Sequence, residues 1–171
     1  AINAKSIDDD VQKYRPWGIS STISSYAKKQ YGRFAGTQEE RLSDLQSALD
    51  DETADIILCS RGGYGLVQLI DKISLEKFKK HPKILLGFSD ITVLHSLFSI
   101  QKLSSVHSIM AKHIVELPEN SIAIQSLKQI IQNKTIEYNI RGHKLNRLGE
   151  VSGTLIGGNL AVLYGLRATP Y

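Results

Sequence analysis

The sequence has little cysteine: a single residue, Cys59, in 171. One thiol cannot form an intramolecular disulfide, so a disulfide-stapled extracellular scaffold is excluded and a reducing compartment is indicated. The first five residues, Ala1 to Lys5, also lack the apolar core segment that a signal peptide carries. Together these features predict a cytoplasmic protein.

Long hydrophobic runs are also missing. Apolar stretches such as residues 84–86 and 160–164 fall far short of the ~20 residues that a membrane-spanning helix needs. With 42% hydrophobic and 22% charged residues, the chain has the balance of a folded domain and not of a disordered or fibrous protein. We therefore expect a soluble protein with no membrane partner.

Charge of one sign is not concentrated anywhere in the chain. Lys and Arg total 21 and Asp and Glu total 17, which gives a formal net charge of +4. The sharpest basic run, residues 78–83, is interpreted as a solvated helix end followed by a proline stop. Histidine, cysteine and acidic residues show no metal-ligand spacing. We expect neither a nucleic-acid partner nor a zinc site.

Helical and buried-strand patterns alternate from Thr37 to about residue 100. Thr37 to Glu40 form a capping box, and leucines at helical spacing predict a helix over 38–49. Apolar runs at 54–59 and 83–88 predict buried parallel strands, each followed by a helix. The predicted fold class is therefore α/β: an open, mostly parallel sheet with flanking helices and a site at the carboxyl ends of the strands.

The C-terminal part has a different character. A further strand is expected near 104–110 and a helix over 121–132, whereas the alternation at 135–140 predicts a half-exposed strand. We interpret residues 1–112 as the α/β domain, 113–145 as a connecting region, and 146–171 as the incomplete beginning of a second, β-containing domain. The segment up to Gly36 has no assignable pattern.

Ser89 is the strongest candidate for chemistry, because it lies between a predicted strand and a predicted helix. A serine on such a turn, a nucleophile elbow, projects its hydroxyl into the cleft above the sheet, and the amide of Asp90 can then stabilise an oxyanion. Ile91 departs from this pattern, which has a small residue two positions after the serine. Alternatively, Ser89 only N-caps the helix.

Gly62-Gly63-Tyr64-Gly65 occupies the corresponding turn after the preceding strand. Parallel strands end at the same sheet edge, so both turns are predicted to face one cleft, where glycine amides can approach a ligand closely. A dinucleotide loop would need a third glycine where Gln68 stands, so nucleotide binding is not expected. A tight turn that needs positive φ would also explain these glycines.

A serine nucleophile needs a base, and the chain contains five histidines. Spacing singles out none of them. His95 lies six residues after Ser89 on the predicted helix, and His81 lies in the basic helix end. His107 and His113 are placed near a strand edge, where either could approach the cleft.

Several short blocks follow one another in a fixed order: Phe34–Thr37, Glu40-Arg41, Asp44-Leu45, Arg61–Gly65, His81–Lys83, Gly87–Thr92 and Gly157–Leu160. Together they resemble the signature blocks of the LD-carboxypeptidases, the muramoyltetrapeptide carboxypeptidases of serine peptidase class S66. The microcin-immunity peptidases belong to the same class. The resemblance covers most of the chain.

The resemblance implies a flavodoxin- or glutamine-amidotransferase-like domain in a cytoplasmic enzyme of peptidoglycan recycling. Such an enzyme removes the terminal D-alanine from a murein-derived tetrapeptide, needs no cofactor, and could be a homodimer. Matched residue by residue, the resemblance assigns the nucleophile to Ser89 and oxyanion-donating amides to Asp90 and Gly63. We expect Gly62, Tyr64 and Arg61 to contact the substrate; alternatively, Arg61 is only an exposed surface residue.

The same resemblance implies a catalytic glutamate and histidine after Tyr171. The chain is therefore expected to be a truncated portion of a longer enzyme. Residues 107–110 depart from the family, whose members commonly have a glycine-proline pair after the histidine.

Two other functions stay open. A related S66 peptidase that acts on peptidyl-nucleotides would keep the same nucleophile and change only the specificity. A non-catalytic module that binds a small anion would use the glycine turn and helix N-termini, with Ser89 only as a cap.

Overall fold

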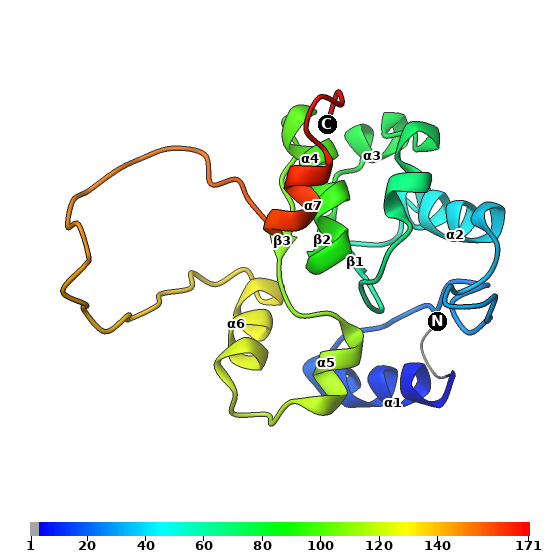
Figure 1. Cartoon of the computed structure of the whole chain (residues 1–171). Coiled ribbons are helices and arrows are strands. Elements are labelled where there is room, and N and C mark those ends of the chain that lie inside the picture. The colour runs from blue at the N-terminus through cyan, green and yellow to red at the C-terminus, as the bar shows by residue number, and fades with distance from the viewer. Residues whose placement is uncertain (1–3) are drawn as a thin grey trace.

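A parallel sheet lies between two layers of helices in the computed structural model, which describes residues 4–171 (Figure 1). The strands β1 (Ile56–Leu58), β2 (Ile84–Gly87) and β3 (Val106–His107) lie in the order β1-β2-β3. Ile57 pairs with Leu85 in one parallel ladder, and Gly87 pairs with His107 in the other. The predicted α/β fold with a parallel sheet is confirmed.

Successive residues of β2 face opposite layers. Leu85 packs on the side of α2 (Gln38–Asp50), α3 (Glu76–Lys80) and α4 (Thr92–Ile100). Leu86 packs on the side of α5 (Ala111–Glu116) and α6 (Ile122–Ile131). Both side chains are fully buried, and burying a leucine contributes roughly 1.5–3 kcal/mol. The two cores therefore fix the orientation of the strand that leads to Ser89.

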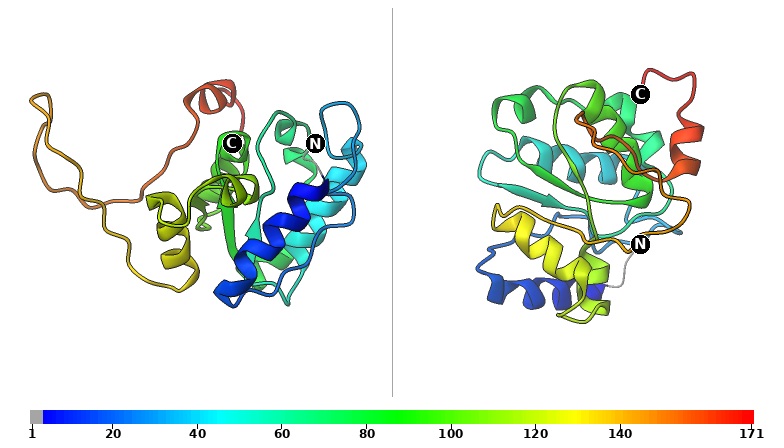
Figure 2. Two further views of the ribbon diagram at one scale, coloured as in Figure 1. Left: turned by 90° about the horizontal axis from the view of Figure 1, so that it is seen from below. Right: turned by 90° about the vertical axis from the view of Figure 1, so that its left-hand side faces the viewer.

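The N-terminal segment, for which no element was predicted, contains α1 (Ala4–Tyr14) and the short 3-10 helix η1 (Arg15–Trp17). Helix α1 packs against α5 on the lower side of the sheet (Figure 2). The Nζ of Lys13 donates to the carbonyls of Val115 and Leu117, at 3.0 Å each, where α5 ends. This contact adds to the apolar face of α1, where Ile7 is buried and Val11, one turn later, packs on the core around Leu86.

Most predicted helices are present. The capping box of α2 forms, because Thr37 Oγ1 accepts from the Glu40 amide and Glu40 accepts from the Thr37 amide. The helix predicted over 121–132 is α6. After the glycine turn, however, the chain forms two 3-10 helices, η2 (Leu66–Gln68) and η3 (Ile70–Lys72), instead of an α-helix.

Residues 133–159 run out from the domain as a long loop, and the chain returns at α7 (Leu160–Gly165) (Figures 1 and 2). The strand predicted at 135–140 is wrong. These residues form no strand, and Ile140 is 86% exposed. Tyr138 and Ile140 are exposed and Ile136 is only half-buried, so the alternation alone does not produce a strand. The proposed domain division stays a prediction.

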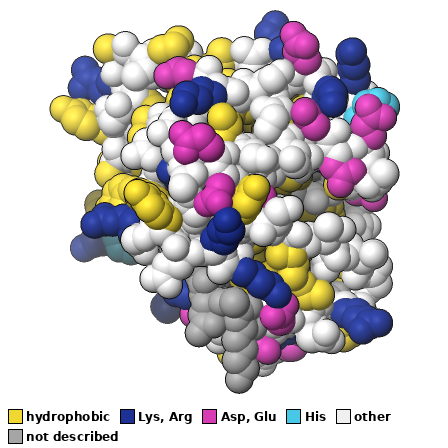
Figure 3. Space-filling view, turned by 90° about the vertical axis from the view of Figure 1, so that its right-hand side faces the viewer, with side chains coloured by type: hydrophobic (Ala, Val, Ile, Leu, Met, Phe, Trp, Pro, Cys, Tyr) yellow, Lys and Arg dark blue, Asp and Glu magenta, His cyan; other side chains and the backbone are white. Residues whose placement is uncertain are grey.

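Acidic and basic side chains are interspersed over the face shown in Figure 3. No helix in residues 4–171 has the length and hydrophobicity that a membrane span requires.

Lys83, just before β2, is buried, and its Nζ donates to two carbonyls at the end of α2, Leu49 at 3.0 Å and Asp51. Lys83→Met keeps the apolar stem but leaves these carbonyls without a donor. We expect it to lower the free energy of unfolding by about 1–3 kcal/mol, measured by urea denaturation. Lys80→Met, at an exposed position of α3, is the control, and an equal effect of both changes would contradict this role of Lys83.

Candidate active site

Ser89 lies at the sharp turn between β2 and the helix that follows. The strand ends at Gly87, Phe88 is extended, and Ser89 has a φ of 63° as the first residue of a 3-10 helix, η4 (Ser89–Ile91), that continues into α4. A non-glycine residue with this backbone costs about 1–3 kcal/mol, and such strain concentrates at active sites. The prediction that Ser89 lies on a strand-to-helix turn is confirmed.

The Ser89 hydroxyl does not cap the helix. Phe88 occupies the N-cap position of η4 and Ile91 that of α4, and neither cap has a side-chain hydrogen bond. The alternative interpretation of Ser89 as an N-cap is therefore wrong. Its hydroxyl is not needed to satisfy the helix amides.

Gly87 explains why a large residue is tolerated two positions after the serine. A Cβ on Gly87 would lie 2.8 Å from Cγ1 of Ile91 and 3.0 Å from its Cγ2. Such distances are far below van der Waals contact. The missing side chain at 87 thus makes the space that Ile91 fills, and Ile91 is buried beneath the turn.

The glycine turn packs directly against the Ser89 turn. A Cβ on Gly62 would lie 3.0 Å from Cβ of Ser89, 3.2 Å from its Oγ and 3.5 Å from the amide nitrogen of Asp90. The predicted convergence of the two turns at one sheet edge is confirmed for Gly62. At Gly63 a Cβ would point into open space, and the Tyr64 side chain is 77% exposed.

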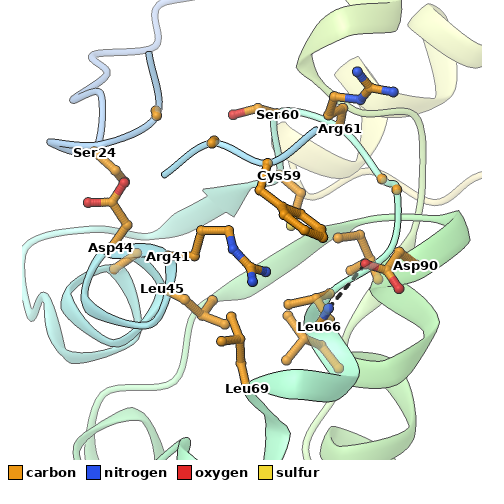
Figure 4. Close-up of a pocket in the computed structure, with 18 of the residues that line it drawn as sticks. Ser24, Arg41, Asp44, Leu45, Cys59, Ser60, Arg61, Leu66, Leu69 and Asp90 are labelled. Carbon is orange, nitrogen blue, oxygen red and sulfur yellow. Dashed lines mark hydrogen bonds between the residues drawn. The ribbon is translucent and has the colours of Figure 1, made fainter. Parts of the chain in front are cut away.

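The Asp90 carboxylate ties the two turns together. Its Oδ2 accepts a hydrogen bond from the amide of Leu66 at 3.3 Å (Figure 4). On the opposite side, Arg41 donates through Nη1 to the carbonyl of Gly65 at 3.1 Å and through Nη2 to Oε1 of Gln68 at 2.8 Å. The end of the glycine turn is thus held by one side chain from each side.

Burial shapes the electrostatics of this site. Burial raises the pKa of Asp90, and the Leu66 hydrogen bond and the positive charge of Arg41 oppose this shift only in part. The guanidinium carbon of Arg41 lies 4.5 Å from the centre of the Phe34 ring, a cation–π arrangement that fixes the plane of the guanidinium. Ionisation of the Asp90 carboxyl is therefore less favourable in the folded protein than in water.

A cavity of about 660 Å³ lies beside the glycine turn, between the end of β1 and helix α2 (Figure 4). Arg41, Cys59 and Asp90 line it. Burial raises the pKa of Cys59 to about 12, so this thiol is neutral at pH 7 and a poor nucleophile. The Arg61 side chain lies at the rim and points away from Arg41 and Asp90 (Figure 4).

None of the five histidines hydrogen-bonds Ser89 within residues 4–171. The two ring nitrogens of His95 contact Ser105 Oγ at 2.7 Å and the carbonyl of Gly87 at 2.9 Å. Burial lowers the pKa of His95, so this histidine is a neutral, structural residue that links α4 to the sheet.

The rings of His107 and His113 both lie beside the ring of Phe88. Their ring centres are 6.0 Å and 5.0 Å, respectively, from that of Phe88. The Nδ1 of His113 is buried without a hydrogen-bond partner in the described part of the chain. Phe88, which directly precedes Ser89, is the common neighbour of both histidines. Neither histidine hydrogen-bonds Ser89 in the described part of the chain.

Known proteins resemble this chain in sequence and in fold. The family model described as the LD-carboxypeptidase N-terminal domain (Peptidase S66) matches residues 1–108. A probable murein peptide carboxypeptidase of Bacillus subtilis is 31% identical over 98% of this chain and 54% of its own length. The chain thus spans about half the length of this curated relative.

Two solved structures share the fold. A muramoyltetrapeptide carboxypeptidase from Oxalobacter formigenes superposes with a TM-score of 0.83 at 22% identity, over 99% of this chain and 57% of that one. The microcin C7 self-immunity protein MccF superposes with a TM-score of 0.78 at 18% identity, over 95% and 58%.

The raised pKa of Asp90 predicts a pH-dependent stability effect. Ionisation of this carboxyl costs more in the folded than in the unfolded chain, so its contribution to stability becomes unfavourable as the pH rises from its ordinary pKa of about 4 through the raised folded value. Asp90→Asn retains an oxygen for the Leu66 amide and removes the charge. Relative to the wild type, we expect this variant to gain stability between pH 4 and pH 7.

Urea unfolding at both pH values measures this difference, with Asp55→Asn at an exposed position as the control. A relative loss of stability for Asp90→Asn as the pH rises would mean that the attraction of Arg41 outweighs burial.

Proposed function

The chain belongs to the LD-carboxypeptidase family, and from this premise we propose that it carries the nucleophile of a serine L,D-carboxypeptidase. The proposed reaction releases the terminal D-alanine from a murein tetrapeptide during peptidoglycan recycling in the cytoplasm. The observation that carries the proposal is the strained turn at Ser89, whose hydroxyl is not used as a cap and lies beside Gly62. The murein substrate is supported by the name of the Bacillus subtilis relative.

In this mechanism Oγ of Ser89 loses its proton to a base and attacks the carbonyl carbon of the scissile L-to-D peptide bond. The carbonyl oxygen becomes an oxyanion, for which the amides of Asp90 and Gly63 are the proposed donors. Each such donor typically contributes about 3–4 kcal/mol of transition-state stabilisation. Collapse of the tetrahedral intermediate breaks the C–N bond and releases D-alanine, and water then hydrolyses the acyl-enzyme.

The contact between the two turns supports this oxyanion assignment. Gly62 packs on Ser89 and on the Asp90 amide, and the Asp90 carboxylate holds the end of the same glycine turn through Leu66. This packing supports the proposal that the donors are positioned before substrate binds, as electrostatic preorganisation requires.

The base is expected outside the described residues, since no histidine there hydrogen-bonds Ser89. The family resemblance assigns this role to a histidine oriented by a glutamate, both downstream of Gly157–Leu160. A carboxypeptidase must also hold the free carboxylate of its substrate. Arg61, at the rim of the cavity beside the glycine turn, is the proposed partner for this charge.

Ser89→Ala tests the nucleophile. In the product of the complete reading frame, we expect release of D-alanine from a murein tetrapeptide to fall by several orders of magnitude. The thermal midpoint should stay nearly unchanged, because the hydroxyl caps no helix. Ser104→Ala, at an exposed position, is the control. Unchanged turnover would exclude Ser89 as the nucleophile, and cleavage of a peptidyl-nucleotide in place of the tetrapeptide would redirect the substrate assignment.

A second prediction concerns the 171-residue polypeptide by itself. It should release no D-alanine, because a serine hydroxyl without a base is a weak nucleophile at neutral pH. Mass spectrometry of the sample verifies its length, and a coupled D-alanine assay measures turnover. Turnover comparable to that of the complete product would place the base within this chain, and His107 and His113 would be the first residues to replace.

A further inference from the structure

The loop of residues 133–159 rejoins the domain at one buried hydroxyl. The Oγ1 of Thr92 accepts a hydrogen bond from the amide of Asn159 at 2.9 Å, although the two residues are 67 positions apart. Thr92 is completely buried. Without the Asn159 amide this buried hydroxyl oxygen would lose a hydrogen-bond donor, so the contact constrains where the returning chain can lie.

Gly158 allows the returning chain to approach Thr92 even more closely. A Cβ at this position would lie 2.5 Å from both Cγ2 and Oγ1 of Thr92. No side chain can be accommodated there without moving one segment away from the other. The contact therefore selects glycine at 158 for its lack of a side chain.

Thr92 is also bonded to the nucleophile turn. Its backbone amide donates to the carbonyl of Ser89, at the point where η4 passes into α4. One residue thus bridges the Ser89 backbone and the returning segment, through its amide on one side and its hydroxyl on the other.

Beyond this contact, the chain is packed again. The side chain of Asn159 accepts from the amide of Val162 and caps α7. Val162 packs on the core that contains Leu94, and Leu166 is 5% exposed. By contrast, residues 141–160 are all exposed. Position 159 is therefore where the orientation of the following helix becomes fixed relative to Ser89.

We propose that Thr92 is a positioning residue. Its hydroxyl holds Gly158-Asn159 at a fixed position relative to the Ser89 turn, and thereby also orients α7 and the chain that follows it. The inference rests on the proposed function, in which the base follows the Gly157–Leu160 block. Thr92 touches no reacting atom in this proposal. It sets the distance between the nucleophile and a base delivered by the later part of the chain.

Thr92→Val is the test, because valine keeps the shape and removes the hydroxyl. In the product of the complete reading frame we expect kcat for D-alanine release to fall about tenfold or more, since small displacements of a catalytic group are costly. KM should change less than twofold. Amide hydrogen exchange should become faster at residues 159–165, and Thr92→Ser, which restores the hydroxyl, should recover both kcat and exchange protection.

Thr154→Val, at an exposed position of the same loop, is the matched control and should leave kcat and exchange unchanged. If Thr92→Val does not fold, Gly158→Ala perturbs the same contact from the other side and should show the same loss of kcat.

Faster exchange with unchanged kcat would overturn the positioning role, as would a Thr92→Ser variant as impaired as Thr92→Val. Unchanged exchange in Thr92→Val would overturn the contact itself. If the wild-type protein releases no D-alanine, the proposed function fails, and the exchange measurement still decides whether the Thr92 hydroxyl holds residues 159–165.

Discussion

The contact between the Ser89 turn and the glycine turn is the constraint on which the rest of the site depends. It exists because β1 and β2 are adjacent and parallel, so both turns emerge at one edge of the sheet. It is as close as it is because Gly62 has no side chain. The Asp90 carboxylate and Arg41 then hold the glycine turn from opposite sides. Without this arrangement, the Ser89 hydroxyl and the amides of the glycine turn would lie apart on two unconnected loops.

The surrounding structure offsets the cost of this arrangement. Ser89 has a strained backbone, and Asp90 bears a charge in a partly buried place. Strain of this kind persists only where neighbouring structure leaves no alternative. Here the two leucines of β2 anchor the preceding strand to both cores, and the buried Ile91 anchors the following turn. Both flanks of the site are therefore core elements.

The sequence was sufficient to predict features with a strong local pattern. The capping box of α2, the apolar runs of β1 and β2, and the position of Ser89 between strand and helix all depend on neighbouring residues, and all are present. Helix α1 also carries a periodic signal, because Ile7 and Val11 lie one turn apart on its buried face, and the sequence interpretation missed it. The role of Arg41 depends on tertiary contacts that leave no periodic signal. The strand predicted at 135–140 failed for the opposite reason, because alternation without a packing partner does not make a strand.

Because β2 is buried on both faces, this sequence tolerates insertions and deletions at some positions and not at others. Side chains alternate between faces along a strand, so inserting or deleting one residue would exchange Leu85 and Leu86 between the layers. It would also rotate Ser89 away from the glycine turn and shift it by about 3.3 Å. The loop over 133–156 has no such coupling, since it is exposed over most of its length. Natural insertions and deletions among homologues should therefore accumulate in that loop and be absent from the four residues of β2.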